Sequence, residues 1–305
     1  MLYFLQQVLN GIHMGALYAL LAFGYVLVNG LLHRTNLAHG AIFAFSGQTM
    51  ILIAVFGWQV LWMTLPMTIG FAIVSTFAYA ALIGWILARG VFEPLARAAP
   101  NAIVVATLGT LIFLSELARI AADTHDFWLP PLLATPVVFA EGGGYRATLT
   151  TIQLLNCAII GVLLVLSGIM LDRSPFGRDW RAVCDDPAAA EMCGVDTYRI
   201  FRAAVLYGAL TAALAGMLAA LYFGNIGFGS GLIFGLKILF VTAVGSYRSP
   251  ARAAVGAACF GIGESLWAGY FPIEWRDAWM LLFLTIMLVL RFSGQGALQP
   301  SRHNF

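Results

Sequence analysis

Five stretches of this chain contain no Asp, Glu, Lys or Arg, and they constrain its fold more than any other feature. They cover residues 1–33, 35–88, 98–115, 147–171 and 203–236. Because a helix needs about 20 apolar residues to cross the hydrocarbon core of a bilayer, the longest stretch has room for two crossings. The composition agrees, since 61% of the side chains are hydrophobic and only 10% are charged. The chain is therefore predicted to be a polytopic membrane protein in a lipid bilayer.

Little of the chain remains for a soluble domain, because the longest polar segment runs only from Asp172 to Arg202. This excludes a self-contained ATPase domain or an extracellular receptor domain. The net charge of +2 is too small to indicate a nucleic-acid partner. The four cysteines form no CxxC pair and have no zinc-like spacing to a histidine, so we expect no disulfide framework, no metal and no cofactor.

The apolar runs and the residues that interrupt them predict an all-α transmembrane bundle of eight to nine spans, in a single domain over residues 1–305. The seventh span is short and has several glycines at its start, so a broken or re-entrant helix is an open alternative there. Glycines inside the spans, such as Gly15, Gly40, Gly161 and Gly216, predict close helix contacts. The expected spans cover residues 11–32, 41–57, 63–88, 102–121, 151–171, 203–223, 233–247, 253–271 and 278–291.

Basic residues predict the orientation, because Lys and Arg are retained on the cytoplasmic side of a membrane. If the amino terminus is outside, twelve arginines fall in cytoplasmic loops and in the tail, and only Arg119, Arg146 and Arg276 fall outside. The carboxyl terminus is then expected to be cytoplasmic. The outside loop from Ala122 to Thr150 is rich in helix breakers. It is expected to be either a docking surface for a partner or a solvated connector.

Residues 172–202 form the main cytoplasmic segment, which holds eleven of the thirty charged residues. In this segment Pro187 follows Asp185 and Asp186, which predicts a short helix capped by one of these carboxylates. Three alanines continue the helix, including Ala189 and Ala190, and Gly194 ends it. A helix with such small side chains suits a groove on a cytoplasmic protein. The alternative is a loop that is only solvated.

Several motifs in this chain resemble one family of transport proteins. The run Ser174-Pro175-Phe176-Gly177-Arg178, with Arg181 and a later Gly194-Val195-Asp196, resembles the cytoplasmic coupling segment of binding-protein-dependent ABC permeases for branched-chain amino acids, ribose and urea. Other motifs occur in the order that is typical of the branched-chain amino acid permease subunit. They are Asn10-Gly11, Gly15-Ala16-Leu17-Tyr18-Ala19-Leu20, Asn36-Leu37-Ala38-His39-Gly40, Pro94-Leu95 before Arg97, Val105-Ala106-Thr107-Leu108-Gly109 and Gly235-Leu236-Lys237.

One region departs from the family pattern. The family usually carries Gly-Gly-x-Gly-Ser-x-x-Gly after the intramembrane lysine, whereas residues Val244 to Arg252 carry bulkier and charged side chains. Exact helix packing at this end does not carry over.

The resemblance implies a permease subunit of an ABC importer for branched-chain or other amino acids, in the bacterial inner membrane. Its implied partners are a second homologous permease subunit, two cytoplasmic ATP-binding subunits and a periplasmic solute-binding protein. The chain has no Gly-x-x-x-x-Gly-Lys-Ser/Thr loop, so the energy has to come from a partner. Urea, a sugar or an aromatic acid remain alternative solutes. An intramembrane enzyme or a proton-coupled carrier is disfavoured, because catalytic residue pairs and several buried acids are lacking.

Two sets of site residues follow from this interpretation. At the cytoplasmic side, Arg178 and Arg181 are expected to anchor the short helix of Asp185, Asp186, Ala189, Ala190 and Gly194 in an ATPase subunit, by pairing with acids there or nearby. Within the membrane, Lys237 and Glu264 are expected to neutralise each other, with direct solute contact as the alternative. Residues considered for the pathway or gate, with packing and capping as alternatives, are Asn36, His39, Gln48, Asn101, Thr107 and Asn225.

Overall fold

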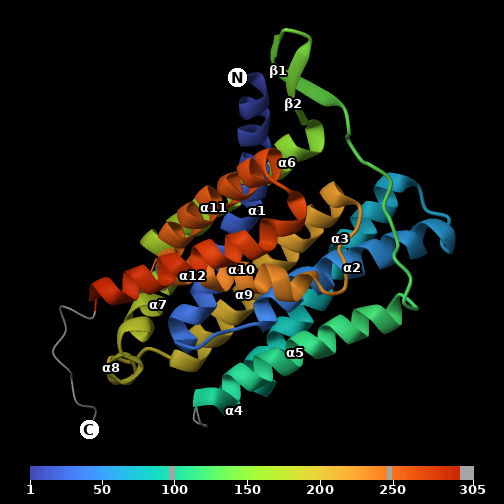
Figure 1. Cartoon of the computed structure of the whole chain (residues 1–305). Coiled ribbons are helices and arrows are strands. Elements are labelled where there is room, and N and C mark those ends of the chain that lie inside the picture. Colours follow the sequence, from blue (N-terminus) through green and yellow to red (C-terminus); the bar gives the residue numbers. More distant parts are fainter. Residues whose placement is uncertain (96–99, 246–248, 296–305) are drawn as a thin grey trace.

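A computed structural model describes residues 1–95, 100–245 and 249–295 of the chain. Within these residues the fold is a helical bundle with one small β-hairpin (Figure 1). Its elements are α1 (Leu2–Leu32), α2 (Ala38–Gln59), α3 (Leu65–Ile86), the π-helix η1 (Leu87–Phe92), α4 (Glu93–Leu95), α5 (Pro100–Ala121), β1 (Pro136–Gly142), β2 (Tyr145–Thr150), α6 (Thr151–Arg173), α7 (Pro175–Asp185), α8 (Pro187–Met192), α9 (Thr197–Phe223), α10 (Ser230–Gly245), α11 (Pro250–Tyr270), the 3₁₀ turn η2 (Ile273–Trp275) and α12 (Arg276–Gln295).

A helix occupies each of the nine segments that the sequence marks as a span. By length and composition, six helical stretches in the described part of the chain can cross a membrane: Leu2–Leu32, Ala38–Gln59, Leu65–Leu95, Asn101–Ala121, Thr151–Arg173 and Thr197–Phe223. The short seventh segment is the 16-residue helix α10, which follows an irregular stretch after Gly224. At 1.5 Å per residue it is about 24 Å long, less than the hydrocarbon core. The protein is thus a polytopic helical membrane protein.

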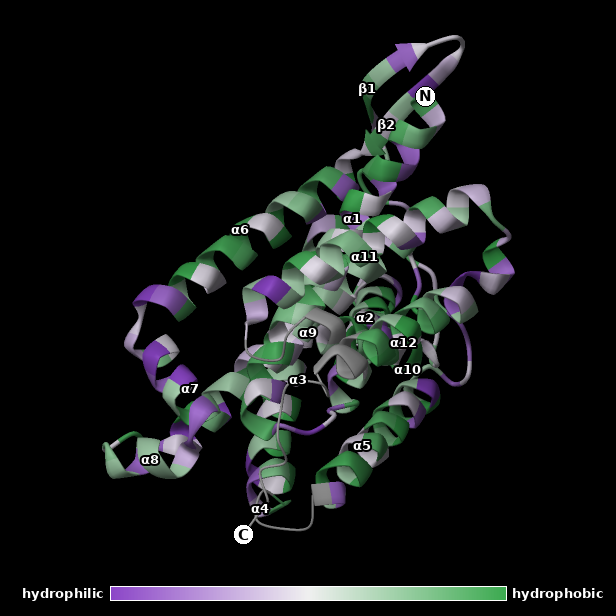
Figure 2. Cartoon of the chain, turned by 60° about the vertical axis from the view of Figure 1, so that its left-hand side comes forward, coloured by the Kyte–Doolittle hydropathy of each residue, from purple (hydrophilic) through white to green (hydrophobic). Residues whose placement is uncertain are grey.

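Helix α1 lies at the centre of the bundle and packs along α11, α9, α6 and α10 (Figure 1). The most apolar window of α1 is 89% buried inside the protein, whereas those of α5 and α6 are only 28% and 22% buried. In Figure 2 most of the ribbon of α5 and α6 has the colour of hydrophobic residues. These two helices therefore present their apolar side chains to the surroundings, as lipid-facing helices do.

Glycines bring some of these helices into backbone contact. A Cβ atom added at Gly15 would meet the backbone of Ala258, and one added at Gly261 would meet the backbone of Gly15 and Met14, so α1 and α11 touch along this line. Gly40 and Gly216 lie in similarly close contacts, as the sequence predicts. The same prediction is wrong for Gly161, where an added Cβ would meet nothing within 4 Å.

The loop from Ala122 to Thr150 contains a β-hairpin that was not predicted from the sequence. Strands β1 and β2 pair in antiparallel register, with Gly142 opposite Tyr145. Gly143 and Gly144 form the turn at φ 58° and 78°, a left-handed conformation that glycine adopts without strain and that suits a two-residue hairpin. The side chain of Gln6 binds the hairpin through both backbone groups of Thr148, at 2.8 and 2.7 Å. The amino-terminal end of α1 is therefore fastened to this hairpin.

The hairpin and the short helices α7 and α8 lie at opposite ends of the molecule (Figures 1 and 2). Helix boundaries also extend further than expected at some of these ends. α1 begins at Leu2 rather than near residue 11, and α9 begins at Thr197 rather than at residue 203. These extra turns are more polar than the spans, so a reading based on apolar runs leaves them out.

Candidate functional site

A cavity of about 580 Å³ lies among α1, α9, α10, α11 and α12. Its lining comes from the amino-terminal parts of α1, α10 and α12 and from the carboxyl-terminal parts of α9 and α11, so it lies toward the end of the bundle that carries the hairpin. Polar side chains of this lining include Gln7, Asn10, Asn225, Ser230 and Ser265. The cavity is thus a water-accessible space beside otherwise apolar helices.

Four charged side chains and one tyrosine form a network at the wall of this cavity. The Lys237 ammonium lies 2.7 Å from Oε1 of Glu264 and 2.8 Å from Oδ1 of Asp277. The Tyr18 hydroxyl donates to Oε2 of Glu264 at 2.6 Å. The Arg276 Nε lies 3.2 Å from the same carboxylates, at Glu264 Oε1 and Asp277 Oδ1. Two cations thus balance two carboxylates, across α1, α10, α11 and α12.

The structure brings Lys237 and Glu264 together, as the sequence analysis expected, but it adds three residues that the analysis did not include. Arg276 and Asp277 directly precede the ninth predicted span, and Arg276 was expected in an outside loop. Their position at the edge of an apolar run is the sequence feature that could have indicated a place close to the membrane-spanning helices. Tyr18 occurs in one of the quoted motifs, but nothing in the motif shows that its hydroxyl faces Glu264, 246 residues away.

The remaining pathway residues do not gather at this network. Asn36 and His39 lie at the start of α2, where Asn36 Oδ1 accepts a bond from the Ala38 amide at 3.1 Å. The His39 ring binds the Leu21 carbonyl at 3.0 Å and packs edge-on against Tyr25. Both side chains are buried. Their observed contacts are local capping and helix packing, the alternatives that the sequence left open.

Gln48 and Asn225 do approach each other. The Gln48 side chain donates to the Ile226 carbonyl at 3.0 Å, in the irregular stretch before α10, and Asn225 lines the large cavity. Thr107 is instead buried and bonded to the Val104 carbonyl of its own helix at 2.9 Å. Asn101 is exposed at the beginning of α5. Of this group, Asn225 is the residue that borders the cavity.

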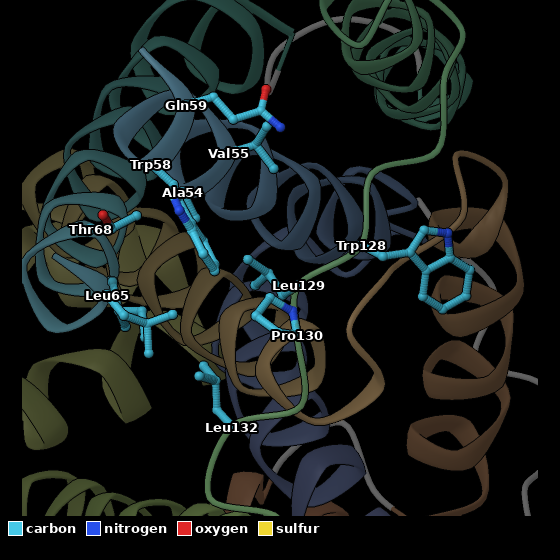
Figure 3. Close-up of a pocket in the computed structure, with 11 residues that line it drawn as sticks. Ala54, Val55, Trp58, Gln59, Leu65, Thr68, Trp128, Leu129, Pro130 and Leu132 are labelled. Carbon is cyan, nitrogen blue, oxygen red and sulfur yellow. The ribbon is translucent and has the colours of Figure 1, made fainter. Parts of the chain in front are cut away.

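A second cavity, of about 240 Å³, lies between the end of α2, the start of α3 and residues 128–132 of the following loop (Figure 3). Its lining contains no charged side chain. Trp128 lines both cavities, and in Figure 3 its ring is directed away from the Trp58 side of the smaller one. The Leu129 amide fixes this loop by donating to the Gly224 carbonyl at 2.9 Å. The smaller cavity offers apolar contact but little recognition chemistry.

At the opposite end of the molecule, the segment 172–202 contains the two short helices α7 and α8, joined by a sharp bend at Asp186. Helix α7 buries Trp180, whose indole donates to the Leu27 carbonyl of α1 at 2.9 Å. Asp186 is the N-cap of α8, and its Oδ1 accepts from the amides of Ala188 and Ala189 at 2.9 and 3.1 Å. Gly194 follows α8 with φ 88°. The predicted short helix is therefore confirmed, with Asp186 rather than Asp185 as its cap.

The two central alanines of α8 differ in exposure. Ala190 is buried against the rest of the chain, and its carbonyl accepts a bond from the Val195 amide at 3.0 Å. Ala189 is exposed, and so is Met192, at 90% of its accessible surface. The exposed residues of α8 are Pro187, Ala188, Ala189, Glu191 and Met192.

The two arginines at the start of this segment form no ion pair with an acid of the described residues. Arg181 instead donates to the Leu171 carbonyl at 2.7 Å, which holds α7 against the end of α6. Arg178 and Asp185 are exposed. Of the quoted motifs, Arg97 lies outside the described residues, as do positions 246–248 of the divergent stretch and the carboxyl-terminal tail.

Comparisons with known proteins agree with this architecture. The family described as "Branched-chain amino acid transport system / permease component" matches residues 7–291. The high-affinity branched-chain amino acid transport system permease protein LivH of Escherichia coli K12 is 28% identical over 297 residues, which is 96% of this chain and 95% of LivH. LivH of Salmonella typhimurium is 27% identical over the same shares of both chains.

A third relative is BraD of Pseudomonas aeruginosa, a permease protein of the high-affinity branched-chain amino acid transport system. It is 26% identical over 300 residues, or 97% of this chain and 96% of BraD. These matches run through nearly all of the helices, and the resemblance that the sequence motifs suggested is confirmed. The chain belongs to the family of permease components of branched-chain amino acid transport systems.

Proposed function

We propose that this chain is the permease subunit of an ABC importer that moves branched-chain amino acids across the bacterial inner membrane. The observation that carries the proposal is the family match over residues 7–291, together with relatives of the same length that are named as branched-chain amino acid permeases. The cavity and its charged wall supply a polar path that an otherwise apolar bundle lacks.

The proposed orientation places the amino terminus and the hairpin outside and the carboxyl terminus in the cytoplasm. It follows from the arginine distribution and puts the large cavity on the outer side and α7 and α8 on the inner side. The permease domain covers residues 1–305 in eight or nine spans. Among them, α10 is a broken or re-entrant helix, since it is short and follows an irregular stretch.

In this proposal residues 172–202 couple the permease to its motor. Two cytoplasmic ATP-binding subunits hydrolyse ATP, and one of them receives α8 in a groove against Ala188, Ala189 and Met192. Exposed Arg178 and Asp185 lie beside this surface, free to pair with charges of the ATPase. A second homologous permease subunit completes the membrane part, and a periplasmic binding protein delivers the solute. Asn225 and Gln48 belong to the outer path.

Reconstitution of the whole transporter tests this function. The chain is combined in proteoliposomes with the second permease, the ATPase subunits and the binding protein of the same transport system. The uptake of labelled leucine, isoleucine and valine is then measured. Uptake that requires ATP, fails with ADP and is competed by unlabelled branched-chain amino acids supports the proposal. Uptake that urea, ribose or an aromatic acid competes, with no effect of leucine, contradicts it.

A further inference from the structure

The charged network divides into an inner pair and an outer pair. The side chains of Lys237 and Glu264 are only 2% and 4% exposed, whereas those of Arg276 and Asp277 are 33% and 38% exposed. All four line the large cavity. The inner pair is thus enclosed by the protein, while the outer pair, in the first turn of α12, has access to whatever enters the cavity.

The two pairs also differ in how fully their polar atoms are used. Glu264 accepts at both oxygens, from Lys237 and Tyr18, and Lys237 donates to Glu264, Asp277 and Tyr18. Arg276 is engaged through Nε, and Asp277 through Oδ1. Among the hydrogen bonds of the described residues, none involves the terminal nitrogens of Arg276 or Oδ2 of Asp277. The outer pair therefore keeps one cationic and one anionic group for a ligand.

A ligand that matches this pair carries both charges close together and has no net charge, because the network is already balanced. The cavity is also lined by the apolar side chains of Met14, Phe43, Ile233 and Phe234. The Phe234 ring centroid lies 5.7 Å from the Lys237 ammonium, so apolar lining begins directly beside the network. The combination suits a molecule with a zwitterionic head and an aliphatic tail. The cavity volume of about 580 Å³ lies in the range of small-molecule sites.

We propose that the permease itself binds the zwitterionic head group of its amino acid in this cavity. The carboxylate lies against the terminal nitrogens of Arg276, the ammonium lies against Oδ2 of Asp277, and the side chain packs toward Phe43 and Phe234. Arginine suits this role, because its planar guanidinium binds a carboxylate through two parallel hydrogen bonds. Lys237 and Glu264 hold the outer pair in place. The inference rests on the proposed function, since it takes a branched-chain amino acid as the solute.

Competition binding tests the head-group site directly. The complex of both permease subunits and the ATPases is placed in nanodiscs without the binding protein, and labelled leucine is displaced by unlabelled leucine, by leucinamide or by 4-methylpentanoate. Leucinamide lacks the carboxylate, and 4-methylpentanoate lacks the ammonium. Each analogue is expected to displace at least about tenfold more weakly than leucine, the effect of losing one charged hydrogen-bonding partner.

Two substitutions then identify which side chain binds the carboxylate and which binds the ammonium of the ligand. In Arg276→Gln the ratio of the leucinamide to the leucine concentration needed for half displacement is expected to fall toward one. The same ratio for 4-methylpentanoate is expected to remain as in wild type. Asp277→Asn is expected to do the reverse. Glu274→Gln is the matched control, because Glu274 is an exposed acid in η2 that does not line the cavity. A substitution that merely loosened the helix packing would weaken all three ligands equally.

Several results would overturn the inference. In the wild-type complex, equal displacement by all three compounds would overturn it, and so would the absence of displaceable leucine binding. Both results are obtained with the wild-type protein alone, so they do not depend on the folding of a variant. Unchanged preferences in folded Arg276→Gln would have the same force. If the complete transporter still imports leucine with ATP, the proposed function stands and only the head-group site is lost. If it imports no leucine, the function fails as well.

Discussion

The charged wall of the cavity and the segment 172–202, which is proposed to be cytoplasmic, use charge in opposite ways. In the wall, Lys237 and Glu264 are buried and their charged groups are paired within the chain. In the cytoplasmic segment, Arg178 and Asp185 are exposed, and neither forms an ion pair with a described residue. Internal pairing stabilises the bundle from within, whereas unpaired exposed charge remains available to a second protein. The two regions therefore differ in whether their charged groups find partners within the chain, and on this difference rests the proposal that the segment 172–202 docks on another protein.

The largest effect on stability is expected for the buried pair of Lys237 and Glu264. Lys237→Met leaves Glu264 with Arg276 as its remaining cation, and breaking a buried pair costs about 3–5 kcal/mol. The thermal unfolding temperature of the purified protein should fall accordingly. The double variant Lys237→Met, Glu264→Gln removes both charges and should recover much of the loss. If the single variant is as stable as wild type, the network does not hold the helices together.

The second test compares the two neighbouring alanines of α8. Ala189→Trp places bulk on the exposed face and should reduce ATP-driven uptake to background while leaving the unfolding temperature unchanged. Ala190→Trp overpacks a buried site and should destabilise the protein itself by about 1–3 kcal/mol. Uptake and unfolding are measured for both variants. Normal uptake with Ala189→Trp would contradict docking of α8 in a groove.

A smaller effect is expected at the cap of α8. Asp186→Ala removes the acceptor for two backbone amides, and loss of an N-cap costs about 1 kcal/mol. Hydrogen exchange at the amides of residues 188–192 should then accelerate about fivefold. Asp186→Asn is the matched control, since asparagine caps nearly as well. Equal exchange rates in the alanine variant and wild type would show that α8 does not depend on its cap.

The smallest effect is expected for an exposed ion pair that belongs to neither region. Arg146 and Glu141 form an ion pair at 2.8 Å on the hairpin, with side chains 64% and 56% exposed. Pairs of this kind contribute less than about 1 kcal/mol. Arg146→Gln should therefore leave stability and uptake near wild type. A strong loss of uptake with normal stability would instead show that the hairpin receives a partner such as the binding protein.

Local signals made most of the helical fold predictable. Apolar runs mark the nine helices, and Pro187 with Asp186 marks the start of α8, because each signal depends on neighbours in the sequence. The hairpin was missed, although Gly143 and Gly144 are suited to its turn, since the surrounding composition indicates only a loop. The charged network could be predicted only in part. Its members stand at positions 18, 237, 264, 276 and 277, and only the packing of four helices brings them together.

The exposure of individual side chains within one turn of α8 could also not be predicted from the sequence. Ala189 and Ala190 have the same side chain, and the sequence analysis assigned both to the docking surface. The direction of α8 is set by how α7 packs, through Trp180, against α1. Which alanine faces outward therefore depends on the contact between Trp180 and Leu27, which are 153 positions apart in the sequence.

The central position of α1 has a consequence for biogenesis. Its closest partner, α11, begins at Pro250, so at synthesis rates of about 5–20 residues per second α1 waits roughly ten to fifty seconds for the surface that buries it. Lys237 leaves the ribosome before Glu264 and Asp277 are synthesised. Until these two residues follow, its ammonium has neither of its carboxylate partners. Insertion of α11 and α12 therefore closes the glycine contact at Gly15 and neutralises Lys237 within the same late step. A ribosome-stalled chain that ends before residue 264 should be held by the insertion machinery, or by a chaperone, rather than released into lipid.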